Sequence, residues 1–218
     1  MRHMTMIGLA VATLACRGRE GTRPEDMSAE AHDAAAASAE AQAVEHRSQY
    51  DPDLVVYETD CSKLCFRGNP TDPHRQKANQ LRREAKRHRD ASHELRVAEA
   101  RACAGIPELH RDLSPFYHRI HITGVEIGDE GPIVVHFDRI PKTTAVELQH
   151  MVDCHLARNA AVGFTMSEMD YCPLAIPGVS ATVVETHAGF DIQLGAADEQ
   201  ARAEVASRVE SLLGSEGE

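Results

Sequence analysis

The large apolar side chains that build a hydrophobic core are distributed very unevenly along this chain. Residues 17–104 contain 9 of the 44 Leu, Ile, Val and Phe residues, whereas residues 105–218 contain 31. A segment with so few apolar side chains cannot bury a core of its own. We therefore expect one globular domain in residues 105–214, which is an ordinary domain size, with a frayed tail at 215–218.

Charge and hydropathy exclude two broad classes of function. The formal net charge of the chain is -11 at pH 7, which argues against a general nucleic-acid binder. No stretch reaches the roughly 18 apolar residues that a membrane-spanning helix requires. We therefore expect neither nucleic acid as a partner nor an internal membrane segment.

The first residues indicate export. Arg2 and His3 precede the mostly apolar run 4–14, whose length is typical of the core of a signal peptide. The sequence Thr13-Leu14-Ala15-Cys16 then resembles the lipobox of bacterial lipoproteins, although the family usually has Leu where this chain has Thr13. The resemblance implies a signal peptide over 1–15, lipidation of Cys16, and a periplasmic or outer-membrane lipoprotein attached to the membrane by its lipid.

Residues 16–49 read as a tether. The segment is rich in Ala, Glu, Ser and Arg, and Met27 and Val44 are its largest apolar side chains. Such a composition leaves little to bury, so we expect a disordered or partly helical spacer between the membrane and the folded domain.

Residues 50–104 combine a cysteine-containing segment with a long helix. Good helix formers fill 74–104 without Gly or Pro, and Gly105 and Pro107 supply a stop. This helix has nine Arg or Lys residues against four acidic ones, and small residues near heptad spacing. The basic residues run round the helix, which favours a solvated helix; the alternative is docking onto anionic lipid or an envelope protein partner.

The C-terminal half predicts a β-β-α-β-β-α order. The strands are expected at 119–127, 133–140, 179–187 and 190–194, as two hairpins. Thr144 and Glu147 form a capping-box pattern at the start of a helix ending near Ala161, and a last helix runs from 197 to about 213. We expect an α/β (α+β) two-layer sandwich with a four-stranded, mostly antiparallel sheet and its helices on one face.

The cysteines predict disulfides if the chain is exported. A bridge between Cys154 and Cys172 is the most natural pair, because it closes a short loop beside the central helix. Either Cys61 or Cys65 could bridge to Cys103 and fix the long helix to the segment before it. Lipidation of Cys16 leaves an odd number of thiols, so at least one is left reduced, metal-bound or paired with another molecule.

A metal site is the competing hypothesis for the same residues. The chain has 13 histidines, and His150 and Cys154 lie four residues apart on one helical face. Imidazole and thiolate together suit Zn or Cu. The candidate ligands are His150, Cys154, His155, Cys172, His118 and His121.

Four sequence segments between Cys103 and Pro173 resemble a group of uncharacterised bacterial envelope lipoproteins. They are Cys103-Ala-Gly-Ile-Pro, Asp112-Leu-Ser-Pro-Phe-Tyr-His, Val152-Asp-Cys-His-Leu-Ala-Arg-Asn and Tyr171-Cys-Pro-Leu. The resemblance implies an exported, tethered protein and carries no established activity.

Motifs for catalysis are absent from the sequence. It has no Gly-x-Ser-x-Gly turn, Gly-rich phosphate loop or nucleotide fingerprint. We therefore expect a binding protein and not an enzyme, in which a transition metal is one possible ligand within a periplasmic buffer or carrier. The alternative is a non-catalytic, disulfide-stapled structural or protein-interaction module of the cell envelope.

Overall fold

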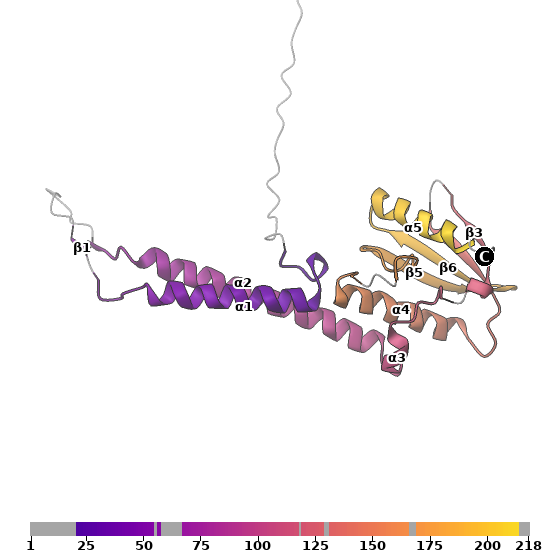
Figure 1. Cartoon of the computed structure of the whole chain (residues 1–218), viewed down its shortest axis with the longest axis horizontal. Coiled ribbons are helices and arrows are strands. Elements are labelled where there is room, and N and C mark those ends of the chain that lie inside the picture. Colours follow the sequence, from indigo (N-terminus) through magenta and orange to yellow (C-terminus); the bar gives the residue numbers. More distant parts are fainter. Residues whose placement is uncertain are drawn as a thin grey trace, which may run out of the picture.

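The computed structural model describes residues 21–54, 56–57, 67–117, 119–128, 131–165 and 169–213. It has two regions, a helical hairpin and an α/β domain, and the hairpin extends away from the domain (Figure 1). Within the described residues, no helix is long and apolar enough to span a membrane.

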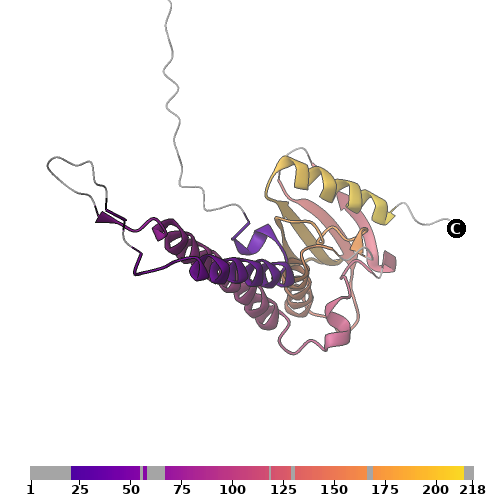
Figure 2. The same cartoon turned by 60° about the vertical axis from the view of Figure 1, so that its left-hand side comes forward.

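The hairpin consists of α1 (Ala29–Ser48) and α2 (Asp72–Ala102). Ser28 caps α1 by accepting a hydrogen bond from the backbone N–H of Ala31. Figures 1 and 2 both show the two helices side by side. The long helix predicted from sequence is confirmed. Residues 29–48, expected to belong to a disordered or partly helical spacer, form a helix that packs along α2.

Small residues explain why the predicted tether folds. Alanines of α1 recur at heptad spacing and are buried against Leu81 and Ala85 of α2. Because alanine side chains are short, the two helix backbones can approach closely and gain many van der Waals contacts. The apolar surface that one helix cannot bury alone is therefore buried by the pair.

Histidines occupy two further layers of the same seam. Nδ1 of His32 lies 3.0 Å from Nδ1 of His88, and Nδ1 of His46 lies 3.1 Å from Nδ1 of His74. In each helix the two histidines are 14 residues apart, which is two heptads. The antiparallel hairpin therefore brings equivalent layers of the two helices together at both positions.

Short elements complete the hairpin and its connection to the domain. The single-turn helix η1 (Pro24–Asp26) precedes α1. The strands β1 (Val56–Tyr57) and β2 (Arg67–Gly68) pair at the end of the hairpin that lies away from the α/β domain (Figure 1). After α2 come α3 (Glu108–Arg111) and η2 (Arg119–His121).

The α/β domain has the predicted topology. The strands are β3 (Ile122–Glu126), β4 (Ile133–Asp138), β5 (Val179–Glu185) and β6 (Gly189–Ala196), in the antiparallel order β3-β4-β6-β5. The helices α4 (Ala145–Val162) and α5 (Glu199–Leu213) follow the two strand pairs. The α/β class, the sheet and the helix order expected from sequence are confirmed.

One face of the sheet carries the core. Alternate residues of β4 and β6 point into the core, where Val135 pairs with Ile192 and both side chains are buried. Leu148 and Val152 of α4 and Val209 of α5 pack against this face. The other face carries mostly polar side chains, such as His136, Asp191 and Gln193, so the domain is a two-layer sandwich.

Local signals in the sequence fix the position of α4. Thr144 accepts a hydrogen bond from the N–H of Glu147, and the Glu147 carboxylate accepts one from the N–H of Thr144, as the capping box predicts. Gly163 ends the helix with a positive φ of 76°. Gln149 of this helix also pairs with the backbone of Ala181 and Val183, which covers the outer edge of β5.

Candidate functional site

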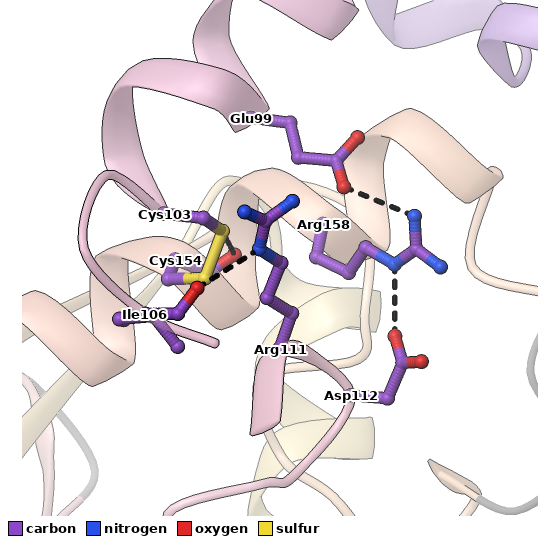
Figure 3. Close-up of a disulfide and its surroundings, with 7 residues drawn as sticks. All are labelled: Glu99, Cys103, Ile106, Arg111, Asp112, Cys154 and Arg158. Carbon is purple, nitrogen blue, oxygen red and sulfur yellow. Dashed lines mark hydrogen bonds and ion pairs between the residues drawn. A yellow bond between two sulfur atoms is a disulfide. The ribbon is translucent and has the colours of Figure 1, made fainter. Parts of the chain in front are cut away.

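A disulfide joins the helical hairpin to the α/β domain. Cys103, the residue after α2, is bonded to Cys154 in the middle of α4 (Figure 3). The two cysteines are 51 residues apart in sequence, so the bond closes a long loop that contains α3, β3 and β4. It fixes the end of α2 against the helix that packs on the sheet.

An arginine of α4 strengthens the same junction. Nη1 of Arg158 lies 3.0 Å from the carboxylate of Glu99 in α2, and its Nε lies 2.8 Å from that of Asp112 (Figure 3). The pKa of Arg158 is raised, chiefly because the guanidinium donates a hydrogen bond to Asp112. One side chain therefore holds three segments together through charge-assisted hydrogen bonds.

A cavity of about 370 Å³ lies beside this junction. Its walls come from α4, from the inner face and end of β4, and from the segment that follows α2. Ligand sites in proteins have volumes of about 300–1,000 Å³ and are mostly apolar, and this cavity meets both criteria. Its apolar lining includes Ile106, Pro107, Leu113, Pro115, Phe137, Ile140, Leu148 and Met151.

Apolar side chains also surround the mouth of the cavity. Leu113 and Met151 retain 49% and 40% of their accessible surface although both line the cavity, and Tyr117 retains 60%. Leu109 and Ile120, in the same stretch of chain, are 84% and 85% exposed. Large apolar side chains clustered at the surface typically mark a binding site.

The cavity has few polar groups. His110, Arg111 and His121 contribute to its lining. Nε of Arg111 donates a hydrogen bond to the carbonyl oxygen of Ile106 at 3.2 Å, which fixes the guanidinium beside the disulfide (Figure 3). Apolar walls with one cation and two imidazoles suit a molecule that has an apolar body and one polar or anionic group.

A buried thiol and imidazole lie next to the cavity. Ser114 lines the cavity and its Oγ lies 3.0 Å from Sγ of Cys172, which in turn lies 3.3 Å from Nε2 of His155. Burial lowers the pKa of His155 to about 4 and raises the pKa of Cys172. Both groups are therefore neutral at pH 7, and the protonated thiol lacks the thiolate character of an activated nucleophile.

The disulfide differs from both pairings predicted from sequence. Cys154 is bonded to Cys103 and not to Cys172, whose thiol is reduced and buried. The prediction was wrong because it paired neighbours in sequence, whereas packing of α2 on α4 brings distant cysteines together. Cys61 and Cys65 lie outside the described residues, and so does the predicted lipidation site Cys16.

The predicted metal ligands do not form one site. Cys154 has no thiolate to offer because it is in the disulfide, and His155 is buried with Cys172. His121 lines the cavity, His150 lies in a separate surface hollow beside β5, and His118 lies outside the described residues. No group of three or more His, Cys, Asp or Glu residues in the described ranges could hold a metal ion.

Several residues of the junction were not predicted from sequence. Arg158, His110, Arg111 and Met151 gain their roles from contacts between segments far apart in the chain. A usable signal was present in the stretch 105–120, where large apolar residues are interrupted by prolines and lack the period of a helix or strand. Such a loop has apolar side chains that regular packing does not bury.

Comparison with known proteins gave no relationship to set beside this geometry. No protein-family model matches the chain, and neither a curated protein nor a solved structure matches it.

Proposed function

We propose that this chain is a non-catalytic binding protein that holds a small amphipathic molecule in the junction cavity. The observation that carries this proposal is the cavity itself, which combines an apolar lining with Arg111 and two histidines. Its half-exposed mouth residues, Leu113 and Met151, give an apolar ligand a path inward. The buried, neutral state of Cys172 and His155 supports binding without covalent chemistry.

We also propose that the protein is exported and attached to the cell envelope through a lipid on Cys16. The lipobox-like sequence 13–16 supports this, and so does the Cys103–Cys154 disulfide, because such bonds persist in oxidising compartments. The mass of the protein purified from its envelope fraction tests the anchor. Acyl chains on Cys16 that disappear in Cys16→Ser are expected, and an unmodified Cys16 would contradict the proposal.

A protein-interaction module is the alternative function. Leu109 and Ile120 support it, because side chains that are 84% and 85% exposed are available to a protein surface and not only to a small molecule. The two functions depend on different leucines, Leu113 for ligand binding and Leu109 for a protein contact. Leu113 lines the cavity, whereas Leu109 does not.

A fluorescence titration with 8-anilinonaphthalene-1-sulfonate tests ligand binding. This probe has an apolar ring system and one anionic group, so it matches the cavity. We expect saturable binding of one probe to the wild-type chain, displaced by fatty acids of medium length. Leu113→Glu should weaken binding at least tenfold, because it places a charge at the mouth of the apolar cavity.

Leu109→Glu is the matched control, because it introduces the same charge a few residues away outside the cavity. It should bind the probe as the wild type does. Equal affinity in all three proteins would contradict the cavity as the binding site. Loss of a protein partner in Leu109→Glu, with no saturable probe binding in any protein, would establish the interaction module instead.

A further inference from the structure

The two histidine pairs of the hairpin are a feature that the cavity does not use. Within each pair the ring centroids are 5.3 or 5.4 Å apart, and the Nδ1 atoms are 3.0 or 3.1 Å apart. In each pair the distance between the ring centroids exceeds the distance between the Nδ1 atoms by about the sum of two ring radii. The two rings therefore meet end-on, with the Nδ1 positions aimed at each other along nearly one line.

Hydrogen bonding fixes the tautomers of the inner pair. Nε2 of His32 lies 3.0 Å from the carbonyl oxygen of Arg23, which can only accept a hydrogen bond. His32 must therefore donate from Nε2, and its Nδ1 has a lone pair when the ring is neutral. His88 supplies the shared proton from its own Nδ1.

The inner pair is almost fully buried in the seam. The exposed fractions of His32 and His88 are 0% and 6%, and the pKa of His88 is lowered, first by burial and then by His32. Glu84 opposes this shift and Arg87 adds to it, while the nearby Asp33 and Arg96 neutralise each other as an ion pair at 2.6 Å. The pair therefore offers two nitrogen donors in a nearly dry environment.

We propose that each of the pairs His32–His88 and His46–His74 is a two-coordinate site for a monovalent soft cation, with Cu(I) as the principal candidate. The cation takes the place of the proton between the two Nδ1 atoms. In the inner site His32 keeps its proton on Nε2, and the His88 proton moves from Nδ1 to Nε2. No electron is transferred and no net proton is released.

Two arguments select Cu(I) over a divalent ion. Two opposed nitrogens provide the linear geometry that d¹⁰ monovalent cations accept, whereas Zn²⁺ requires four ligands, and no group of three ligands is present in the described part of the chain. Burying one positive charge in an alanine-lined seam also costs less than burying two. Imidazole is a suitable ligand for copper.

The geometry requires only a small adjustment. Metal–imidazole bonds are about 2 Å long, so a linear bridge needs its nitrogens about 4 Å apart, which is about 1 Å more than in the structure. The neighbouring layers contain Ala36, Ala85 and Ser92, so no large side chain lies beside the rings in the seam. The outer pair is only partly buried, so it is the easier one for the metal to reach.

An anaerobic Cu(I) titration of the full chain against a chromophoric chelator tests the proposal. Other groups in the chain can also bind Cu(I), so the measurement is the number of equivalents lost on substitution. We expect His32→Gln and His46→Gln each to lose one equivalent and the double variant to lose two. His93→Gln, at an exposed position of α2, is the matched control and should lose none.

A second measurement avoids any dependence on the folding of variants. Ag(I) added to the wild-type chain with ¹⁵N-labelled histidine should give one-bond silver coupling at Nδ1 of His32, His46, His74 and His88. Equal stoichiometry in all the titrated proteins, or silver coupling confined to other histidines, would overturn the proposal. In that case the pairs serve only as hydrogen bonds within the hairpin.

Discussion

The two regions of this molecule are stabilised in opposite ways. The α/β domain fills its core with large side chains such as Phe190, Ile192 and Leu194. The hairpin has a core of alanines with Leu81, and it buries imidazoles in the same seam. The domain therefore depends on the volume that it fills, and the hairpin depends on how closely two backbones can approach.

This difference teaches that a scarcity of large apolar residues does not by itself imply disorder. Alanine contributes little apolar area per residue, but at heptad spacing on two adjacent helices it allows extensive van der Waals contact. The hairpin also connects to the domain through the disulfide and Arg158. Each region should therefore respond to a different kind of substitution.

The largest effect is expected from removing volume in the domain. Phe190 is 2% exposed and pairs with Phe137 in the sheet. Phe190→Ala should destabilise the domain by about 3–5 kcal/mol, from lost burial and the resulting cavity. Urea denaturation followed by circular dichroism measures this change, and a loss below about 1 kcal/mol would contradict the role of this side chain.

The disulfide should contribute nearly as much. The bond joins residues 51 apart, and the chain-entropy model gives about 4 kcal/mol for a loop of that length. Cys103→Ser with Cys154→Ser should therefore lower the free energy of unfolding by up to that amount and loosen the cavity wall that Cys154 forms. Intact stability in the double variant would contradict this contribution and would show that Arg158 suffices for the junction.

Acid should destabilise the domain through His155. Its pKa is about 4 in the folded state because the ring is buried, compared with about 6.5 in an unfolded chain. The unfolded state therefore binds more protons between these values, and stability falls as the pH falls from 6.5 to 4, by about 3 kcal/mol. In His155→Gln this part of the pH dependence of the free energy of unfolding should disappear. Urea denaturation curves measured at pH 7, 6, 5 and 4 test this.

The hairpin should be sensitive to added volume. Ala85 is 0% exposed against α1, so Ala85→Leu would force the helices apart and cost about 1–3 kcal/mol. Ala98→Leu, at an exposed position of the same helix, is expected to have almost no effect. The amide protons of α1 should lose protection from hydrogen exchange in Ala85→Leu. Equal protection in both variants would show that the seam is not closely packed.

The smallest effect concerns the open face of the sheet. His136 has a raised pKa, first because of its hydrogen bond to Asp191, at 2.7 Å, with a smaller contribution from Glu126. This pair stabilises the fold fully below about pH 6.5 and loses its effect as the pH rises through the folded pKa. The side chain is 31% exposed, so the change should be below about 1 kcal/mol; Asp191→Asn should abolish it in the same urea measurements.

The regular elements were predictable because their signals are local. The capping box at Thr144 and Glu147 and the alternation along β4 each depend on residues within a few positions of each other. The hairpin was missed in part because its alanines look like a linker unless both helices are considered together. The 14-residue spacing of His32 with His46, repeated in α2, was a signal for the pairing.

The candidate site was largely out of reach of the sequence. Its geometry depends on α2 packing against α4, which brings Cys103 to Cys154 and Glu99 to Arg158. Contacts over such separations leave no local pattern, so the wrong disulfide pairs were chosen by proximity in the chain. The metal hypothesis placed its ligands in the domain, whereas the end-on histidine pairs lie in the hairpin.

Native mass spectrometry of the full chain, purified from its native source, tests the central claim of a ligand in the junction cavity most directly. The wild type and Leu109→Glu should each retain one noncovalent organic molecule that is released on denaturation, and Leu113→Glu should lack it. An organic adduct that persists in Leu113→Glu, or no adduct in any of the three proteins, would contradict the account.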